Sequence, residues 1–252
     1  MRVLKRNWVL FLAAMAVCLP LTARAEEGQA SGPDTVIPAD KMNEQWWKDR
    51  HEVNKARIAE GNVDLLLLGD SITHFWDTTG QAVEAYYYGG RNAVDMGFGG
   101  DRTQHLLWRL IDAPMEKIHP KAAMVLIGVN NTVANSPEEI AAGIKANVDK
   151  LTELFPDMKI LLLDIFPALN NGHAIREKID GTNALLPEMF KDYPNVTLLD
   201  IGGIWLDENG EIPKELMDDG VHPTECGYKL WGAAVEPVIA EMLGDTPKPK
   251  ME

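Results

Sequence analysis

Short, uninterrupted apolar runs alternate with helical patterns through most of this chain. A run that is apolar at every position predicts a strand buried on both faces, as in a parallel sheet, whereas a half-exposed strand would alternate apolar with polar residues. Parallel strands need long crossover connections, usually helices, so the pattern predicts an α/β fold with helices on both faces of the sheet. The runs that we interpret as strands are residues 62–68, 93–96, 122–127, 159–165 and 196–199.

The segments between and around these runs carry helical patterns. The most complete signal is Ser136-Pro137-Glu138-Glu139, a capping box with proline at the first helical position. Five strands with their helices in about 190 residues fit a single domain, which we place at residues 41–244. The predicted helices span residues 41–60, 102–111, 137–155, 175–192 and 224–243, with a shorter helix and a loop in residues 74–90.

The two ends of the chain differ from this domain. Residues 1–25 combine a basic start, an uncharged apolar run and Ala23-Arg24-Ala25, which predicts a signal peptide cleaved after Ala25. The apolar run is shorter than the roughly 20 residues of a membrane span. An uncleaved anchor is the alternative. Residues 26–40 predict a linker and residues 245–252 a mobile tail. We therefore expect an exported protein, periplasmic or extracellular, without stable membrane insertion after cleavage.

The chain is acidic, with a net charge of −14. The predicted signal peptide carries four basic and no acidic residues, so its removal leaves a net charge of −18. Nucleic acid and anionic membrane surfaces would repel such a protein, so we predict neither as a partner and favour a neutral or cationic substrate. Cys226 would be the one thiol of the mature chain, so no internal disulfide forms and the core must supply the stability.

Three chemically useful residues follow predicted strands. Ser71 follows an apolar run and Gly-Asp, and Gly100 and Asn130 follow the next two strands. The carboxyl ends of parallel strands meet at one edge of the sheet, where α/β proteins bind ligands. Ser71 offers a hydroxyl and an N–H group, Gly100 an N–H group and Asn130 an NH₂ group. These are the nucleophile and oxyanion donors that acyl transfer needs, although Gly-Asp-Ser alone also fits an ordinary turn with a serine cap.

A general base for such a reaction is found among the six histidines. His222 lies in a loop just before the last predicted helix, and Asp219 precedes it by three residues. In a turn, this spacing can bring a carboxylate to the Nδ1 atom of the imidazole and leave the Nε2 atom facing outward. The string alone also fits a surface turn.

Together these blocks resemble the SGNH hydrolases, also called GDSL esterases and lipases. The blocks are Gly69-Asp70-Ser71, Gly97-Phe98-Gly99-Gly100-Asp101, Gly128-Val129-Asn130-Asn131 and Asp219-Gly220-Val221-His222, with Ile72 where the family name has leucine. The resemblance implies Ser71 as nucleophile, His222 as base and then acid, and Asp219 as the group that orients His222. It implies an oxyanion hole made by the N–H groups of Ser71 and Gly100 and the side chain of Asn130.

The same resemblance implies a flavodoxin-like three-layer α/β/α sandwich around a five-stranded parallel sheet in the order 2-1-3-4-5. It also implies no metal and no cofactor, and the sequence shows neither metal-ligand spacing nor a phosphate-binding glycine loop.

One branch of the family matches more closely. Residues 99–110, Gly-Gly-Asp-Arg-Thr-Gln-His-Leu-Leu-Trp-Arg-Leu, are similar to the catalytic subunits of platelet-activating factor acetylhydrolase. Those subunits pair, so a homodimer is considered, although no sequence feature here forces one. We interpret Trp108 and Arg109 as structural residues, and Asp101 as a helix cap or a brace of its loop.

The predicted activity is that of an exported serine esterase that hydrolyses short-chain, acetyl esters by a Ser-His-Asp acyl-enzyme mechanism. Export favours carbohydrate O-acetyl groups as substrate, whereas the branch resemblance favours a short-chain phospholipid acetylhydrolase or lysophospholipase. A non-catalytic binding protein on the same fold is the alternative from another class. Its signature would be the loss of Ser71, His222 or Asn130, and all three are present.

Overall fold

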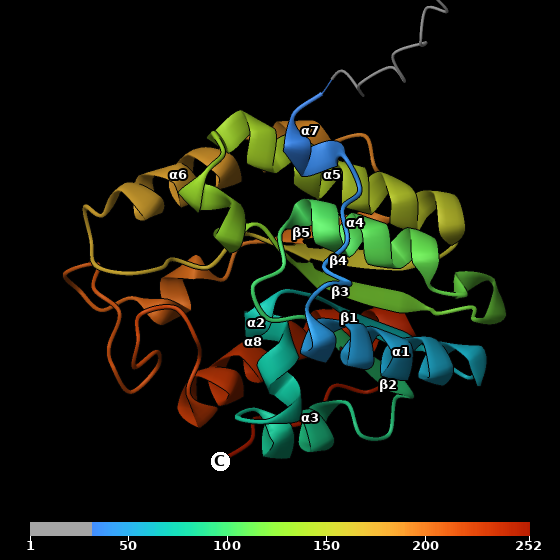
Figure 1. Ribbon diagram of the computed structural model, residues 1–252. Helices are drawn as coiled ribbons and strands as arrows, with labels where there is room; N and C mark the ends of the chain where they lie inside the picture. Colours follow the sequence, from blue (N-terminus) through green and yellow to red (C-terminus); the bar gives the residue numbers. More distant parts are fainter. Residues whose placement is uncertain (1–31) are drawn as a thin grey trace, which may run out of the picture. The chain divides into compact units, whose positions relative to one another are not determined.

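The five predicted strands form one parallel sheet in the computed structural model, which describes residues 32–252 (Figure 1). Their order across the sheet is β2-β1-β3-β4-β5, so the expected order 2-1-3-4-5 is confirmed. Leu68 lies opposite Met96 of β2 and Val125 of β3, which makes β1 an inner strand. The strands are β1 (Leu65–Gly69), β2 (Ala93–Gly97), β3 (Ala122–Leu126), β4 (Lys159–Leu163) and β5 (Val196–Leu199).

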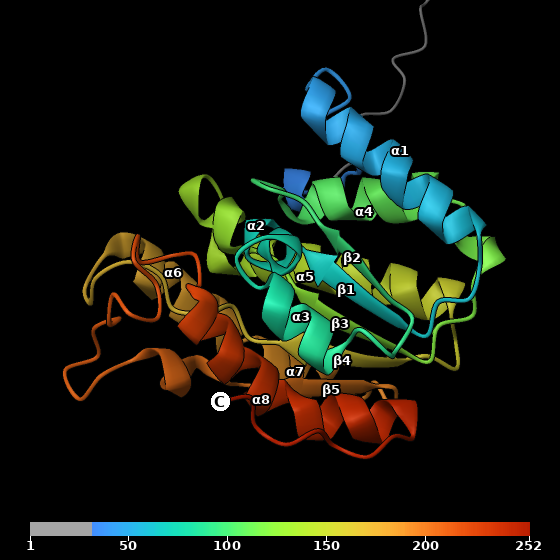
Figure 2. The same ribbon diagram turned by 90° about the horizontal axis from the view of Figure 1, so that it is seen from below.

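Helices cover both faces of this sheet, as its apolar strands require (Figures 1 and 2). One face carries α4, α5 and α6, the other carries α3 and α8, and α1 packs against the edge strand β2. The predicted α/β/α sandwich is therefore confirmed. The helices are α1 (Gln45–Ala59), α2 (Ser71–His74), α3 (Gln81–Tyr87), α4 (Thr103–Asp112), α5 (Pro137–Leu154), α6 (Ala174–Asn183), α7 (Leu186–Phe190) and α8 (Glu225–Leu243).

Local signals set the ends of these helices. The predicted capping box is confirmed, because the Ser136 hydroxyl accepts the Glu139 N–H and the Glu139 carboxylate accepts the Ser136 N–H. Gly244 ends α8 in the left-handed region, at φ 71°. The predicted helix 175–192 is instead two helices. Pro187 lies in the first turn of α7, where its missing N–H is tolerated, and it would break a hydrogen bond inside one longer helix.

Two aromatic side chains of α8 pack against Trp76 and connect the core to the turn after β1. Trp76, Tyr228 and Trp231 are fully buried, and the Trp76 ring centroid lies 4.5 Å from that of Tyr228 and 4.7 Å from that of Trp231. The Tyr228 hydroxyl donates to the Ile72 carbonyl at 2.7 Å. The core therefore holds the residue next to Ser71 in place.

The part of the predicted linker that the structure describes, residues 32–40, packs instead against two helices. Thr35 is fully buried and its hydroxyl donates to the Glu139 carbonyl of α5 at 2.7 Å. In turn, the Thr103 hydroxyl of α4 donates to the Thr35 carbonyl at 2.9 Å. The compact unit accordingly begins at Gly32 rather than at residue 41. The predicted signal peptide, residues 1–25, and residues 26–31 lie outside the described residues.

Residues 245–252, predicted as a mobile tail, lie along α3 and α8. The Lys248 ammonium donates to the Tyr87 carbonyl at 2.9 Å, and the Met251 N–H donates to the Tyr87 hydroxyl at 3.1 Å. The Lys248 N–H donates to the Glu236 carboxylate of α8 at 2.7 Å. No helix within residues 32–252 is long and apolar enough to cross a membrane.

Candidate active site

Ser71 lies at the carboxyl edge of the sheet, where β1 turns directly into α2. Asp70 caps this helix, and its side chain accepts the Ile72 N–H at 3.0 Å. Burial is the main cause that raises the pKa of Asp70 to about 7. The turn is tight enough to require glycine at position 69, because a Cβ atom there would lie 2.3 Å from the Leu126 carbonyl. Ser71 is 8% exposed, so its hydroxyl lies just below the surface.

His222 and Asp219 complete a hydrogen-bonded chain with this serine. The His222 Nε2 atom lies 2.8 Å from the Ser71 Oγ atom, and its Nδ1 atom lies 2.6 Å from the Asp219 Oδ2 atom. The other Asp219 oxygen accepts the backbone N–H groups of Val221 and His222. Partial burial raises the pKa of Asp219, but the hydrogen bonds from His222 and from these N–H groups outweigh it and lower the pKa overall. The three residues therefore have the geometry of a nucleophile, a base and its orienting carboxylate.

The loop that carries His222 depends on a glycine and on a neighbouring segment. Gly220 has φ 76°, which lets the chain turn back so that Asp219 meets the His222 ring. The Leu169 N–H donates to the Gly220 carbonyl at 2.7 Å. Leu169 itself has φ 61°, and Arg176 of α6 donates to its carbonyl at 2.6 Å. The segment after β4 therefore supports the loop between β5 and α8.

Gly100 and Asn130, the other predicted site residues, are joined to one another. The Asn130 NH₂ group donates to the Asp101 carbonyl at 2.9 Å, directly beside Gly100. Gly100 is exposed at φ 68°, and within residues 32–252 no acceptor pairs with its N–H. The Asn130 bond uses one of its two amide hydrogens. Both residues thus keep a donor available at the same edge of the sheet.

A buried ion pair holds the loop of Gly100 against the strand that leads to Ser71. Arg109 and Asp101 are both fully buried, with the Arg109 Nε atom 2.9 Å from the Asp101 Oδ2 atom. The same guanidinium donates to the carbonyls of Met96 at 2.9 Å and Gly69 at 3.2 Å. Trp47 of α1 donates to the second Asp101 oxygen at 2.8 Å. The predicted structural role of Arg109 and the loop-bracing role of Asp101 are confirmed.

Two further residues support this loop and were not assigned to the site from the sequence. His74, one turn after Ser71, accepts the Gly99 N–H on its Nδ1 atom at 3.2 Å. Burial and the nearby Arg50 charge lower the pKa of His74, which favours the neutral ring that can accept this bond. Arg50 of α1 donates to the Gly97 carbonyl at 2.8 Å. The spacing from Ser71 could have indicated His74, whereas Arg50 precedes the sheet and carries no local signal.

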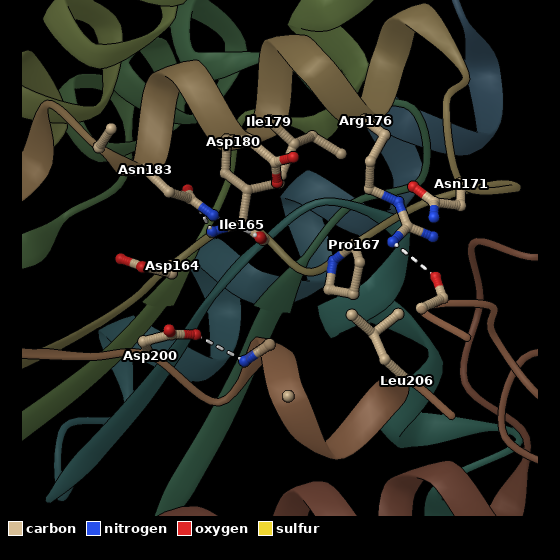
Figure 3. A pocket seen from close by; sticks show the side chains of 14 residues that line it. Asp164, Ile165, Pro167, Asn171, Arg176, Ile179, Asp180, Asn183, Asp200 and Leu206 are labelled. Atoms are coloured by element: carbon tan, nitrogen blue, oxygen red, sulfur yellow. Dashed lines mark hydrogen bonds between the residues drawn. The ribbon is translucent and has the colours of Figure 1, made fainter. Parts of the chain in front are cut away.

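A pocket of about 540 Å³ lies at the ends of β4 and β5. Figure 3 shows Asp164 and Asp200 at the strand ends on one side of the pocket and Arg176, Asp180 and Asn183 of α6 on the other. Burial and the Asp200 charge raise the pKa of Asp164 to about 6. No residue of the triad lines this pocket. Within residues 32–252, no group of three or more His, Cys, Asp or Glu side chains is placed to hold a metal ion.

The model of the GDSL-like lipase/acylhydrolase family matches residues 67–230. The chain belongs to this family. Platelet-activating factor acetylhydrolase IB subunit alpha2 from Rattus norvegicus is 32% identical over 213 residues, which cover 84% of this chain and 91% of the relative.

Among solved structures, a GDSL-like lipase from Bacteroides thetaiotaomicron has a TM-score of 0.62 at 18% identity, covering 77% of this chain and 97% of that one. A carbohydrate esterase family 3 protein from Talaromyces cellulolyticus has a TM-score of 0.56 at 18% identity, covering 73% and 99%. At these identities the likeness concerns the fold.

This GDSL hydrolase is accordingly a serine ester hydrolase related to the platelet-activating factor acetylhydrolase branch. The matched range begins in β1 and ends in the first turns of α8, so it contains the five predicted site residues. Helix α1, which supplies Trp47 and Arg50 to the loop of Gly100, lies before the matched range.

Proposed function

We propose that this GDSL hydrolase is an exported acetylesterase that removes acetyl groups from carbohydrates. The observation that carries the proposal is the continuous hydrogen-bonded chain Ser71–His222–Asp219, with heavy-atom distances of 2.8 and 2.6 Å. Both distances lie within the range for a nucleophile and its base. Export to the periplasm or the medium rests on the predicted signal peptide, residues 1–25.

In the first half of the reaction, the Ser71 Oγ atom attacks the ester carbonyl carbon while the His222 Nε2 atom takes the serine proton. The Asp219 carboxylate holds the Nδ1–H of the ring and stabilises the imidazolium that forms. Collapse of the tetrahedral intermediate breaks the bond to the alcohol oxygen, which receives the proton from Nε2. The products of this half-reaction are the free alcohol and an acetyl-serine.

In the second half, water attacks the acetyl-serine while the His222 Nε2 atom accepts a proton from it. Collapse of the second tetrahedral intermediate breaks the acyl bond to Ser71, which regains its proton from Nε2. Acetic acid leaves and gives its proton to solvent as acetate forms, and the resting state is restored. His222 therefore serves as base and then acid in both halves, and within residues 32–252 it is the one side chain in hydrogen-bond contact with the Ser71 hydroxyl.

The negative oxygen of both intermediates needs preorganised donors. We assign them as the N–H groups of Ser71 and Gly100 and the second amide hydrogen of Asn130. The proposal is supported by the free N–H of Gly100 and by the bond that fixes Asn130 beside it. Donors held by the protein stabilise the intermediate without reorganising during the reaction.

The test of catalysis is hydrolysis of p-nitrophenyl acetate by the wild type and by Ser71→Ala. We expect the variant to lose about 10⁶-fold in kcat, because the nucleophile is absent. Equal rates would overturn the enzyme mechanism and favour a binding protein on the same fold. A chain-length series from acetate to octanoate follows, and a clear preference for octanoate would contradict the short-acyl proposal.

A short-chain phospholipid is the second candidate substrate. It is favoured by the 32% identity to platelet-activating factor acetylhydrolase IB subunit alpha2. Acetylated xylan and a short-chain acetyl phospholipid, compared at equal ester concentration, separate the two. A higher kcat/KM for the phospholipid would overturn the carbohydrate assignment and leave the triad chemistry intact.

A further inference from the structure

Trp46 is an exposed aromatic side chain beside the loop of Gly100. It is 44% exposed, whereas Trp47, Trp76, Trp205 and Trp231 are fully buried. Within residues 32–252 it is the one aromatic among the large hydrophobic side chains that are exposed. Exposing so large an apolar surface is unfavourable, and such residues commonly mark binding surfaces.

The Trp46 ring is fixed in place. Its Nε1 atom donates to the Glu44 carboxylate at 3.0 Å. The ring stacks on the His74 imidazole, with centroids 6.2 Å apart and planes inclined by 16°. A side chain that is ordered before binding loses little conformational entropy when a ligand arrives. Trp46 is therefore prepared to act as a rigid platform.

Trp46 lies beside the loop of Gly100, whose N–H group we assign to the oxyanion hole. The Trp46 Cη2 atom lies 3.6 Å from the position that a Cβ atom would take on Gly99. The Lys41 ammonium lies 3.6 Å from the corresponding position on Gly100. Because neither glycine has a side chain, the space between the loop and these two residues stays narrow but open. Trp46 and Lys41 therefore lie directly against the two glycines of the loop that supplies the proposed oxyanion donor.

The charges around the ring select among possible ligands. The Lys41 ammonium lies 5.7 Å from the Trp46 ring centroid, so a quaternary ammonium at the same ring would meet a like charge. Lys41 and the Glu44 carboxylate also border the ring, which disfavours a long acyl chain that would strip water from both charges. A sugar ring suits this surface, because its C–H face packs on the indole while its hydroxyl groups bond to the ammonium and the carboxylate.

We propose that Trp46 and Lys41 form a subsite for the sugar ring that carries the acetyl group, on the leaving-group side of the ester. The inference rests on the proposed carbohydrate esterase function and assigns the residues that recognise the sugar. It gives α1, which precedes the family-matched range, a part in substrate selection.

The test compares acetylated xylobiose with methyl acetate, whose leaving group has no ring. For Trp46→Ala we expect the ratio of the two kcat/KM values to fall about tenfold, mainly through a higher KM for the saccharide. Trp46→Phe keeps a stacking ring and should retain most of the ratio. Val53→Ala is the matched control, because Val53 is 68% exposed on the same helix, about 10 Å farther along its axis. Its ratio should stay at the wild-type value.

The outcomes separate the two proposals. A wild type that hydrolyses methyl acetate but not acetylated xylobiose would overturn the carbohydrate function and with it the sugar subsite. A wild type active on both substrates, with Trp46→Ala changing neither or both equally, would overturn the subsite alone. A larger loss on acetylcholine than on acetylated xylobiose would show that the ring holds a cation instead. Titration of Ser71→Ala with xylobiose, with and without Trp46→Ala, gives a second readout, and we expect weaker binding in the double variant.

Discussion

The two sides of the candidate active site are built differently. Residues 218–222, which include Asp219 and His222, are exposed or partly exposed to solvent, and the Asp219 side chain is 55% exposed. The loop of residues 97–101 is fixed by the ion pair between its own Asp101 and Arg109 of α4, and both side chains are fully buried. One side offers groups that exchange protons with water, and the other offers backbone donors in a rigid frame.

This difference follows from the chemistry that each side would perform. A base must accept and return protons, so its partners need hydrogen bonds but no deep burial. An oxyanion hole works because its donors are already oriented, which requires that the backbone does not relax during the reaction. Substitutions on the open side should therefore change activity, and those on the buried side should change stability first.

The largest effect is expected on the open side, from His222→Ala. Loss of the base should lower kcat about 10⁶-fold, while the melting temperature changes little. Stopped assays with p-nitrophenyl acetate and thermal unfolding measure the two effects. Asp218→Ala is the matched control, since Asp218 is exposed in the same loop and outside the triad, and it should keep wild-type kcat. A similar loss in both variants would contradict the assignment of His222.

On the buried side, Arg109→Met should lower the free energy of unfolding by about 3–5 kcal/mol. The substitution leaves the Asp101 charge without its main partner and removes the Arg109 side-chain donor from the Met96 and Gly69 carbonyls. Urea unfolding measures the change. Lys48→Met, at an exposed position of α1, should stay within about 0.5 kcal/mol of the wild type. A loss below about 1 kcal/mol for Arg109→Met would mean that the frame does not depend on this pair.

The adjacent residues Asn130 and Asn131 test the same contrast between activity and stability within a single turn. Asn130→Ala should lower kcat about 10²- to 10³-fold with little change in KM, because one oxyanion donor is lost. Asn131 is fully buried, accepts the Thr103 N–H and donates to Gln104. Asn131→Ala should therefore reduce stability instead. Kinetics and unfolding of both variants distinguish the roles, and a reversed pattern would exchange them.

The smallest effects concern pH. Burial raises the pKa of Asp70 to about 7, so the folded protein favours its neutral form. Its contribution to stability is full below the usual aspartate pKa and is lost as the pH rises towards 7. The pKa of Asp219 is lowered, so its contribution is present above the usual value and is lost as the pH falls below it.

Unfolding curves from pH 3 to 8 test these opposite signs. Relative to the wild type, Asp70→Asn should gain stability as the pH rises towards 7, whereas Asp219→Asn should lose stability as the pH rises towards about 4 and keep a constant deficit above it. Parallel pH profiles for the wild type and Asp70→Asn would show that Asp70 titrates normally.

Sequence patterns were sufficient for elements that depend on neighbouring residues. The leucines of residues 65–68 indicated a fully buried strand because burial on both faces requires apolar side chains at every position. The Ser136 capping box and the turn around Gly220 are likewise local. The reading of residues 175–192 as one helix was wrong because the apolar period continues past Asn183, where α6 ends, and through Pro187, which lies in the first turn of α7.

Strand order and site membership came from recognised motifs rather than from periodicity. Ser71 and His222 are separated by 151 positions, and nothing in either local sequence specifies a 2.8 Å contact. Only their joint occurrence with Gly100 and Asn130, in family order, predicted that they meet.

The sequence by itself determined the class of fold, the strands and the candidate triad, because apolar period, turn residues and motif blocks are properties of short segments. The tertiary structure alone decided which charges are buried together, which tryptophan stays exposed and where residues 32–40 and 245–252 pack. Arg109 and Asp101 form one buried pair under the loop of Gly100, whereas Trp46 and Trp47, adjacent in sequence, face solvent and core. These outcomes depend on which surfaces come into contact when helices and sheet assemble.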